Sequence, residues 1–130
     1  MKKLFAIILV LVLLTAVPLT GFAGSAYDTY VIGTWTGYAA VDGGSDSLQP
    51  HSGTTLKINS DGTCSWSFAG ENMSGTWKYL STEKAGYAYS MTVSVWESRA
   101  TVVFIYSTLP ELYGDLSVSV GDTIYLYHKA

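Results

Sequence analysis

Cysteine is almost absent from this chain, which holds one, Cys64, among its 130 residues. A single cysteine excludes an internal disulfide and a zinc site built on several thiolates. Because the residues around it alternate between apolar and polar, we expect Cys64 to be a small buried hydrophobe in a strand. A reactive thiol or an intermolecular bridge is the alternative.

Charge and histidine are also scarce. The sequence has seven basic and ten acidic residues and no basic cluster, so nucleic acid and anionic membranes are not expected as partners. His51 and His128 fit no known nucleophile or metal spacing, so we expect neither an enzyme nor a cofactor. Asp42 and Asp46 flank a Gly-Gly-Ser stretch, but no glutamate follows at the spacing of an EF-hand, so no metal is expected.

The long apolar run of the sequence is confined to its amino terminus. Lys2 and Lys3 precede residues 4–17, and this run is shorter than the ~20 residues that span a bilayer. The pattern is typical of a signal peptide covering residues 1–23, with cleavage after Ala23 and a second possible site after Ala26. An uncleaved anchor is the alternative. The signal suggests a bacterial protein that is secreted.

Cleavage after residue 23 would leave five basic residues against ten acidic ones. The remaining chain is long enough for one domain with one core. We divide it into a short N-terminal segment, 24–30, and a domain, 31–130. We expect no membrane contact after cleavage.

Helical periodicity is lacking beyond the signal, and alternation with period two takes its place. Cys64, Trp66 and Phe68, for example, alternate with polar neighbours, as in a half-buried antiparallel strand. Asp61-Gly62 is a strong hairpin turn between two such runs. The predicted strands are 31–41, 54–59, 63–69, 73–80, 87–95, 100–107, 113–119 and 123–128. Eight regularly spaced strands predict an all-β fold, an antiparallel up-and-down eight-stranded β-barrel, with a β-sandwich as the alternative.

Two strands carry further information about the predicted barrel. Trp35 should share a face with Gly37, Ala39 and Val41, which indicates a barrel plugged at one end and roomier at the other. Residues 101–106 are apolar on both faces. Their outer face would be covered by the N-terminal segment, by a neighbouring chain, or by nothing.

Three short motifs in order suggest a family. Gly33-Thr34-Trp35 is followed by Leu-Lys-Ile-Asn-Ser-Asp-Gly-Thr at 56–63 and by Ser-Gly-Thr-Trp-Lys-Tyr at 74–79. This order resembles the calycin superfamily of lipocalins and avidins, and it is most similar to short lipocalin-like domains of secreted bacterial proteins. The Thr-Asp-Tyr motif of typical lipocalins is missing. Lys129 is the nearest positional match to their late arginine, which packs across the first tryptophan.

The resemblance implies that the long first loop, 42–53, is a lid over the open end. Alternation of loops brings the turns near residues 70, 97 and 121 to the same end. The predicted ligand-binding residues at this mouth are His51, Phe68, Trp96 and Arg99. Strand parity points Trp96 outward, although the following turn could swing it inward. A flexible surface loop without a ligand is the alternative.

Two functions follow from this sequence. The first is a secreted binding module for a small apolar or amphipathic ligand held at the barrel mouth. The alternative is a structural or interaction protein without an internal cavity, which binds another protein or a glycan through exposed tyrosines. Ten tyrosines fit either function, because tyrosine offers apolar area and a polar tip.

Overall fold

The computed structural model describes residues 25–43 and 47–130, so the predicted signal peptide and residues 44–46 of the predicted lid lie outside the described residues. Two short 3-10 helices, η1 (Asp28–Tyr30) and η2 (Pro110–Leu112), accompany the strands. The strands are β1 (Gly33–Asp42), β2 (Gln49–Pro50), β3 (Thr55–Ile58), β4 (Thr63–Phe68), β5 (Glu71–Glu83), β6 (Gly86–Val95), β7 (Ser98–Ser107), β8 (Leu116–Val120) and β9 (Thr123–Lys129).

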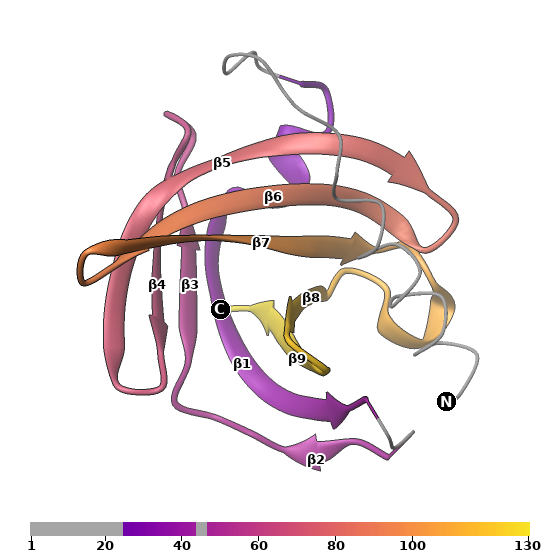
Figure 1. Cartoon of the computed structure of the whole chain (residues 1–130). Helices are drawn as coiled ribbons and strands as arrows, with labels where there is room; N and C mark the ends of the chain where they lie inside the picture. The colour runs from indigo at the N-terminus through magenta and orange to yellow at the C-terminus, as the bar shows by residue number, and fades with distance from the viewer. Residues whose placement is uncertain (1–24, 44–46) are drawn as a thin grey trace.

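The strands form one closed antiparallel barrel. From β3 to β9 each strand pairs with the next, β3 pairs with β1, and β9 pairs back with β1 to close the ring (Figure 1). The predicted all-β, eight-stranded up-and-down barrel is therefore confirmed. The short strand β2, which pairs only with β1, was not predicted. β5 is also longer than predicted at both ends, and β8 begins at Leu116, three residues later than predicted.

A bulge in β1 overturns one expectation about side-chain direction. β1 is in register with β9 up to Gly37 and again from Ala39, which leaves Tyr38 as an extra residue. Because side chains alternate along a strand, one extra residue moves everything after it to the opposite face. The prediction that Ala39 and Val41 share the inner face with Trp35 is therefore wrong. Both lie on the outer face.

The outer face of β7 is apolar, as the sequence indicated, and it is buried. Val103 and Ile105 belong to a cluster outside the barrel that also contains Leu112, with Leu109 packed against it. The connection that carries η2 therefore covers part of this face. Sequence reasoning had considered only the N-terminal segment, a neighbouring chain or no cover.

The two Gly-Thr-Trp tripeptides occupy similar environments. Trp35 and Trp77 are both buried, and their indole N–H groups donate to the carbonyl oxygens of Val31 and Asn59, each at 2.8 Å. A Cβ on Gly75 would lie 1.8 Å from the carbonyl oxygen of Thr92, so only glycine lets β5 and β6 approach here. The predicted core role of both tryptophans is confirmed.

Candidate functional site

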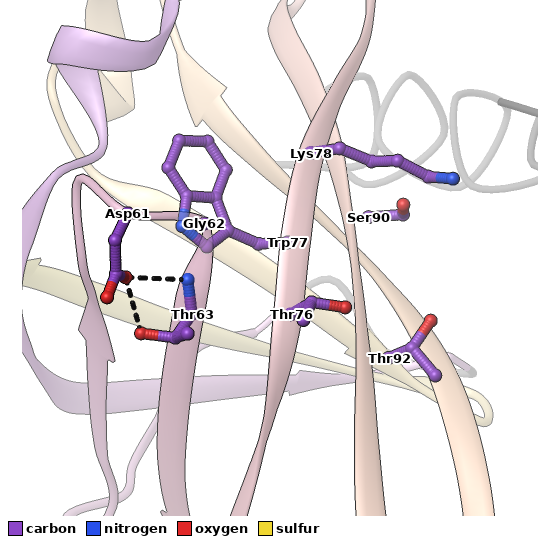
Figure 2. Close-up of a pocket in the computed structure, with 8 residues that line it drawn as sticks. All are labelled: Asp61, Gly62, Thr63, Thr76, Trp77, Lys78, Ser90 and Thr92. Atoms are coloured by element: carbon purple, nitrogen blue, oxygen red, sulfur yellow. Dashed lines mark hydrogen bonds between the residues drawn. The ribbon is translucent and has the colours of Figure 1, made fainter. Parts of the chain in front are cut away.

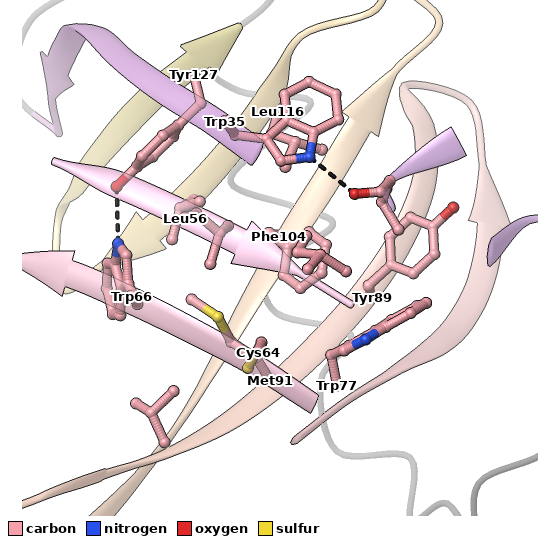
Figure 3. Close-up of a cluster of buried hydrophobic side chains, with 14 of the residues drawn as sticks. Trp35, Leu56, Cys64, Trp66, Trp77, Tyr89, Met91, Phe104, Leu116 and Tyr127 are labelled. Atoms are coloured by element: carbon pink, nitrogen blue, oxygen red, sulfur yellow. Dashed lines mark hydrogen bonds between the residues drawn. The ribbon is translucent and has the colours of Figure 1, made fainter. Parts of the chain in front are cut away.

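The centre of the barrel is filled by its own side chains (Figure 3). Tyr89 and Phe104 stack with their ring centroids 5.2 Å apart, and both have no exposed surface. Cys64 and Met91 fill the space beside them. Side chains without water-accessible surface cannot line a water-sized void, so no ligand fits at this level of the barrel.

A chain of hydrogen bonds closes the next layer. The indole N–H of Trp66 donates to the hydroxyl of Tyr127 at 2.9 Å, and this hydroxyl lies 2.7 Å from that of Thr54. Thr54 in turn donates to the carbonyl oxygen of Ser67 at 2.8 Å. Burial raises the pKa of Tyr127, which keeps its hydroxyl protonated. The side chains of Thr54, Trp66 and Tyr127 are at most 4% exposed, so this hydrogen-bonded layer forms a closed floor.

Two aromatic rings lie above this floor, at the end where β4 finishes and β9 begins. Phe68 and Tyr125 meet edge to face with centroids 4.8 Å apart, and Phe68 also lies 4.8 Å from Trp66 below it. Both upper rings are only partly buried. The ring of His51 covers them, 4.9 Å from Tyr125 and 6.4 Å from Phe68. We call His51, Phe68 and Tyr125 the mouth site.

Backbone bonds fix the position of His51 above the rings. Its amide donates to the carbonyl oxygen of Tyr38 at 3.1 Å, and the amide of Gly37 donates to Thr54 at 2.9 Å. The segment between β2 and β3 is therefore held against β1. The Nδ1 atom of His51 is buried and has no hydrogen-bond partner. A buried ring nitrogen without a partner is unusual, and a ligand would reach it only after the His51 ring turned.

The other two predicted residues lie on the rim and face solvent. Phe68 pairs with Glu71 and Ser74 with Ser94, so the strand register puts the β6–β7 turn at the same end as the mouth site. Trp96 in that turn is 85% exposed, so its side chain does not swing into the barrel. Arg99 is also exposed. His51 and Phe68 are thus brought together, while Trp96 and Arg99 remain at the rim.

Sequence reasoning missed Tyr125 as a member of the mouth site. The signal was present, because Tyr125 lies two residues before Tyr127 on one face of β9. It was overlooked because the predicted site, apart from Phe68, was drawn from loops and turns.

The opposite end of the barrel is closed by a stack of tyrosines. Tyr27 and Tyr30 are three residues apart around η1, a spacing that puts them on the same face of a 3-10 helix. Tyr27 inserts between Tyr79 and Tyr87, with centroid distances of 5.0 and 4.7 Å. Tyr30 contacts both Tyr87 and Tyr106, at 4.9 and 5.2 Å, and these two rings stack on each other at 6.1 Å. These five residues form a continuous set of ring contacts, some stacked and some tilted, which we call the tyrosine stack.

Polar contacts anchor the segment that supplies two of these rings. The hydroxyl of Tyr89 donates to the carbonyl oxygen of Tyr27. The Lys129 ammonium donates to the carbonyl oxygen of Ile32 at 2.8 Å and lies 4.8 Å above the Trp35 ring. Partial burial lowers the pKa of Lys129. Lys129 therefore packs across the first tryptophan, in the place that the resemblance implied for an arginine.

A groove of about 360 Å³ also lies on the outside of the barrel (Figure 2). Hydroxyl groups of Thr76, Thr92 and Ser90 line it, beside the β3–β4 turn. Asp61 is the carboxylate that lines this groove, and it accepts hydrogen bonds from the amide and hydroxyl of Thr63 at 3.0 and 2.6 Å. These hydrogen bonds lower the pKa of Asp61. These bonds assign Asp61 to shaping the turn.

The described residues offer little other chemistry. They contain no group of three histidine, cysteine, aspartate or glutamate side chains placed to hold a metal ion. They also contain no helix long and apolar enough to cross a membrane. Cys64 is unpaired and buried, and burial raises the pKa of its thiol to about 11, so the thiolate is scarce near neutral pH.

Comparison with protein-family models, with curated proteins and with solved structures finds no match. The barrel is consistent with a lipocalin-like fold and compatible with a binding module.

Proposed function

We propose that this chain is a secreted binding module that holds a small apolar or amphipathic ligand at the mouth site. The observation that supports it is the unpartnered, buried Nδ1 of His51 beside two partly exposed aromatic rings. Because the layer of Trp66 and Tyr127 is closed, the ligand would lie across the rings of Phe68 and Tyr125 instead of entering the barrel.

Each part of such a ligand has a matching group. An alkyl chain or flat ring would cover the partly exposed faces of Phe68 and Tyr125, at a gain of about 25 cal/mol per Å² of apolar surface removed from water. A polar head group would bond to Nδ1 of His51 once the ring turned to expose this buried atom. A carboxylate head would also meet the permanent positive charge of Arg99 on the same rim.

Intrinsic tryptophan fluorescence tests this proposal, because Trp66 contacts Phe68 directly. We expect medium-chain fatty acids to change the emission in a saturable way. Phe68→Ala and His51→Gln should each weaken binding about tenfold, the effect of losing about 1.4 kcal/mol. Tyr113→Ala, at the other end of the barrel, is the matched control and should bind normally. If no amphiphile binds at high micromolar concentration, the proposal fails.

A second candidate function is binding of a protein or glycan through tyrosines at the closed end. The observation that favours it is the exposure of Tyr113 and Tyr30, 69% and 41% respectively, beside the tyrosine stack. Exposed tyrosines are common at interfaces. This function predicts that Tyr113→Ala abolishes binding to the partner, whereas Phe68→Ala leaves it unchanged, the reverse of the pattern expected for the mouth.

A further inference from the structure

The connection between β7 and β8 brings an exposed tyrosine to the edge of the tyrosine stack. The amide of Gly114 donates to the carbonyl oxygen of Ser107 at 3.0 Å, and the amide of Ser107 donates to that of Asp115 at 2.9 Å. These two bonds hold the connection beside the end of β7, directly after Tyr106. A Cβ on Gly114 would lie 3.7 Å from the Tyr106 hydroxyl, so the chain passes close to this group. Tyr113, the residue before Gly114, is 69% exposed.

The hydroxyl groups of these tyrosines lie close enough to affect one another's ionisation. Burial raises the pKa of Tyr106, and the charges that Tyr113 and Tyr30 would carry raise it further. Burial also raises the pKa of Tyr87, and the proximity of the Tyr30 and Tyr113 hydroxyls raises it further. Neither the Tyr106 nor the Tyr113 hydroxyl has a hydrogen-bond partner among the described residues. Their oxygen atoms can therefore accept hydrogen bonds from a ligand that carries donors.

Carboxylates outnumber cations around these rings. Glu111 in η2 is exposed and forms no ion pair within the described part of the chain. Asp115 accepts the Tyr38 hydroxyl with its Oδ2 atom at 2.5 Å, and its Oδ1 atom accepts no hydrogen bond from a described residue. The adjacent β5–β6 turn adds Glu83 and Lys84, and the connection between β7 and β8 contains no lysine or arginine. The surface therefore attracts a cation more strongly than an anion.

We propose that this surface of the closed end binds an arginine side chain of a partner protein. The proposal deepens the second candidate function, on which it rests, and it is independent of the mouth ligand. The guanidinium group would stack on the exposed ring of Tyr113 and donate to the phenolic oxygen of Tyr106. Its charge would lie near Glu111 and Asp115. The partly exposed ring of Tyr30 would contact the aliphatic part of the same side chain.

Other classes of ligand match this surface less well. An anion would meet the carboxylates of Glu111 and Asp115. A neutral glycan could stack on Tyr113, but it would bring no charge to these carboxylates. A lysine ammonium has the charge, but it lacks the planar fork that stacks on a ring and donates to several oxygens at once. Tyrosine and arginine are also the residue types that contribute most often to binding at protein interfaces.

The experiment titrates the purified exported protein with three blocked peptides of equal length that differ at one central residue. This residue is arginine, citrulline or lysine. Citrulline has nearly the shape of arginine without its charge, and lysine has a charge without the planar group. NMR chemical shifts of the Tyr113 ring measure each dissociation constant. The arginine peptide should bind about tenfold more tightly than the citrulline peptide, and the lysine peptide should be intermediate.

Matched variants locate the binding. Tyr113→Ala should weaken binding of the arginine peptide about fivefold, whereas Tyr113→Phe keeps the ring and should stay within about twofold of the unaltered chain. Trp96→Ala removes an exposed aromatic ring at the mouth end and should bind normally. Glu111→Gln should weaken binding about threefold. Asp122→Asn removes an equal charge in the β8–β9 turn at the mouth end and should have little effect. Backbone amide shifts follow binding in the variants that lack the Tyr113 ring.

Equal binding of the arginine and citrulline peptides would overturn the proposal, as would the absence of binding at millimolar concentration or unchanged binding by Tyr113→Ala. Equal weakening by Glu111→Gln and Asp122→Asn would show a general attraction to a negative protein and would also refute the site. If a neutral oligosaccharide shifts the Tyr113 resonances and the arginine peptide does not, the second candidate function stands for glycans and the arginine proposal fails.

Discussion

The two ends of the barrel are both built from aromatic side chains, but they differ in the polar contacts that hold the segments covering them. At the closed end, the rings of Tyr27 and Tyr30 each contact two barrel tyrosines, although Tyr30 is itself 41% exposed, and Trp35 has both an indole hydrogen bond and a lysine above its ring. At the mouth, Phe68 and Tyr125 stay partly exposed under a single histidine.

The difference arises from the segments that cover the two ends. The N-terminal segment supplies two large rings and leads directly into β1, so it closes its end with a short, well-anchored piece of chain. The segment before β3 supplies one small ring, whose Nδ1 is left without a partner. We expect the end with the anchored segment to contribute more to stability, and the proposed ligand would bind at the other.

The largest expected effect separates two tryptophans, one from each end. Trp35→Ala removes a buried ring together with its hydrogen bond and should cost about 3–5 kcal/mol of unfolding free energy. Trp96→Ala removes a side chain that is 85% exposed and should change it by less than about 0.5 kcal/mol. Urea unfolding of both variants measures the contrast. Similar losses for the two would contradict the assignment of the closed end as the better packed one.

The next effect tests the tyrosine stack. Tyr27→Ala removes two ring contacts and should cost about 2 kcal/mol, because an aromatic pair contributes about 0.5–1.5 kcal/mol beyond burial of its area. Tyr113, which is 69% exposed, provides the matched variant Tyr113→Ala, with little change expected. A double-mutant cycle between Tyr27 and Tyr87 should show coupling. Additive losses would mean that the stack contributes no interaction of its own.

The sequence predicted most of the fold because apolar and polar residues alternate in most of its strands. The runs that became β4 and β6 alternate between apolar and polar residues, and short turns bound most of the strands. The bulge at Tyr38 could not be predicted, because nothing local to β1 shows where β9 changes register. The tyrosine stack was missed for a related reason: Tyr27 and Tyr30 lie in a segment without periodicity, and their partners come from three strands distant in sequence.

The mouth was predicted less completely than the fold. Phe68 followed from the parity of β4, and His51 followed from the lid implied by the resemblance. Trp96 was assigned by its place in a turn, where alternation no longer determines direction. Its φ of 54° belongs to a turn conformation that the sequence around Glu97 does not signal, since glycine is absent there.

A smaller effect concerns pH at the closed end. Burial raises the pKa of Tyr89, so the stability that comes from keeping this tyrosine protonated is present below about pH 10 and is lost as the pH rises further. Tyr89→Phe should lower the free energy of unfolding by about 1 kcal/mol near neutral pH, because the hydrogen bond to Tyr27 is lost. It should also make the loss of stability at alkaline pH smaller. Circular dichroism between pH 7 and 12 checks both. An unchanged alkaline transition in Tyr89→Phe would show that other tyrosines govern it.

The smallest expected effect asks whether the rim adds charge recognition to the aromatic mouth. Arg99 is exposed, so Arg99→Gln should change the unfolding free energy by less than about 0.5 kcal/mol. An ion pair at an exposed site contributes at most about 1 kcal/mol, so binding of a fatty acid should weaken by no more than about fivefold. The alcohol of the same chain length carries no charge and should bind Arg99→Gln as it binds the unaltered chain. Lys57→Gln removes an equal charge on the outer face of β3 and controls for net charge. If Arg99→Gln weakens binding of the acid and of the alcohol equally, Arg99 acts by packing instead of by charge. If Lys57→Gln weakens binding of the acid as much as Arg99→Gln does, the effect is a general electrostatic field, which added salt should abolish.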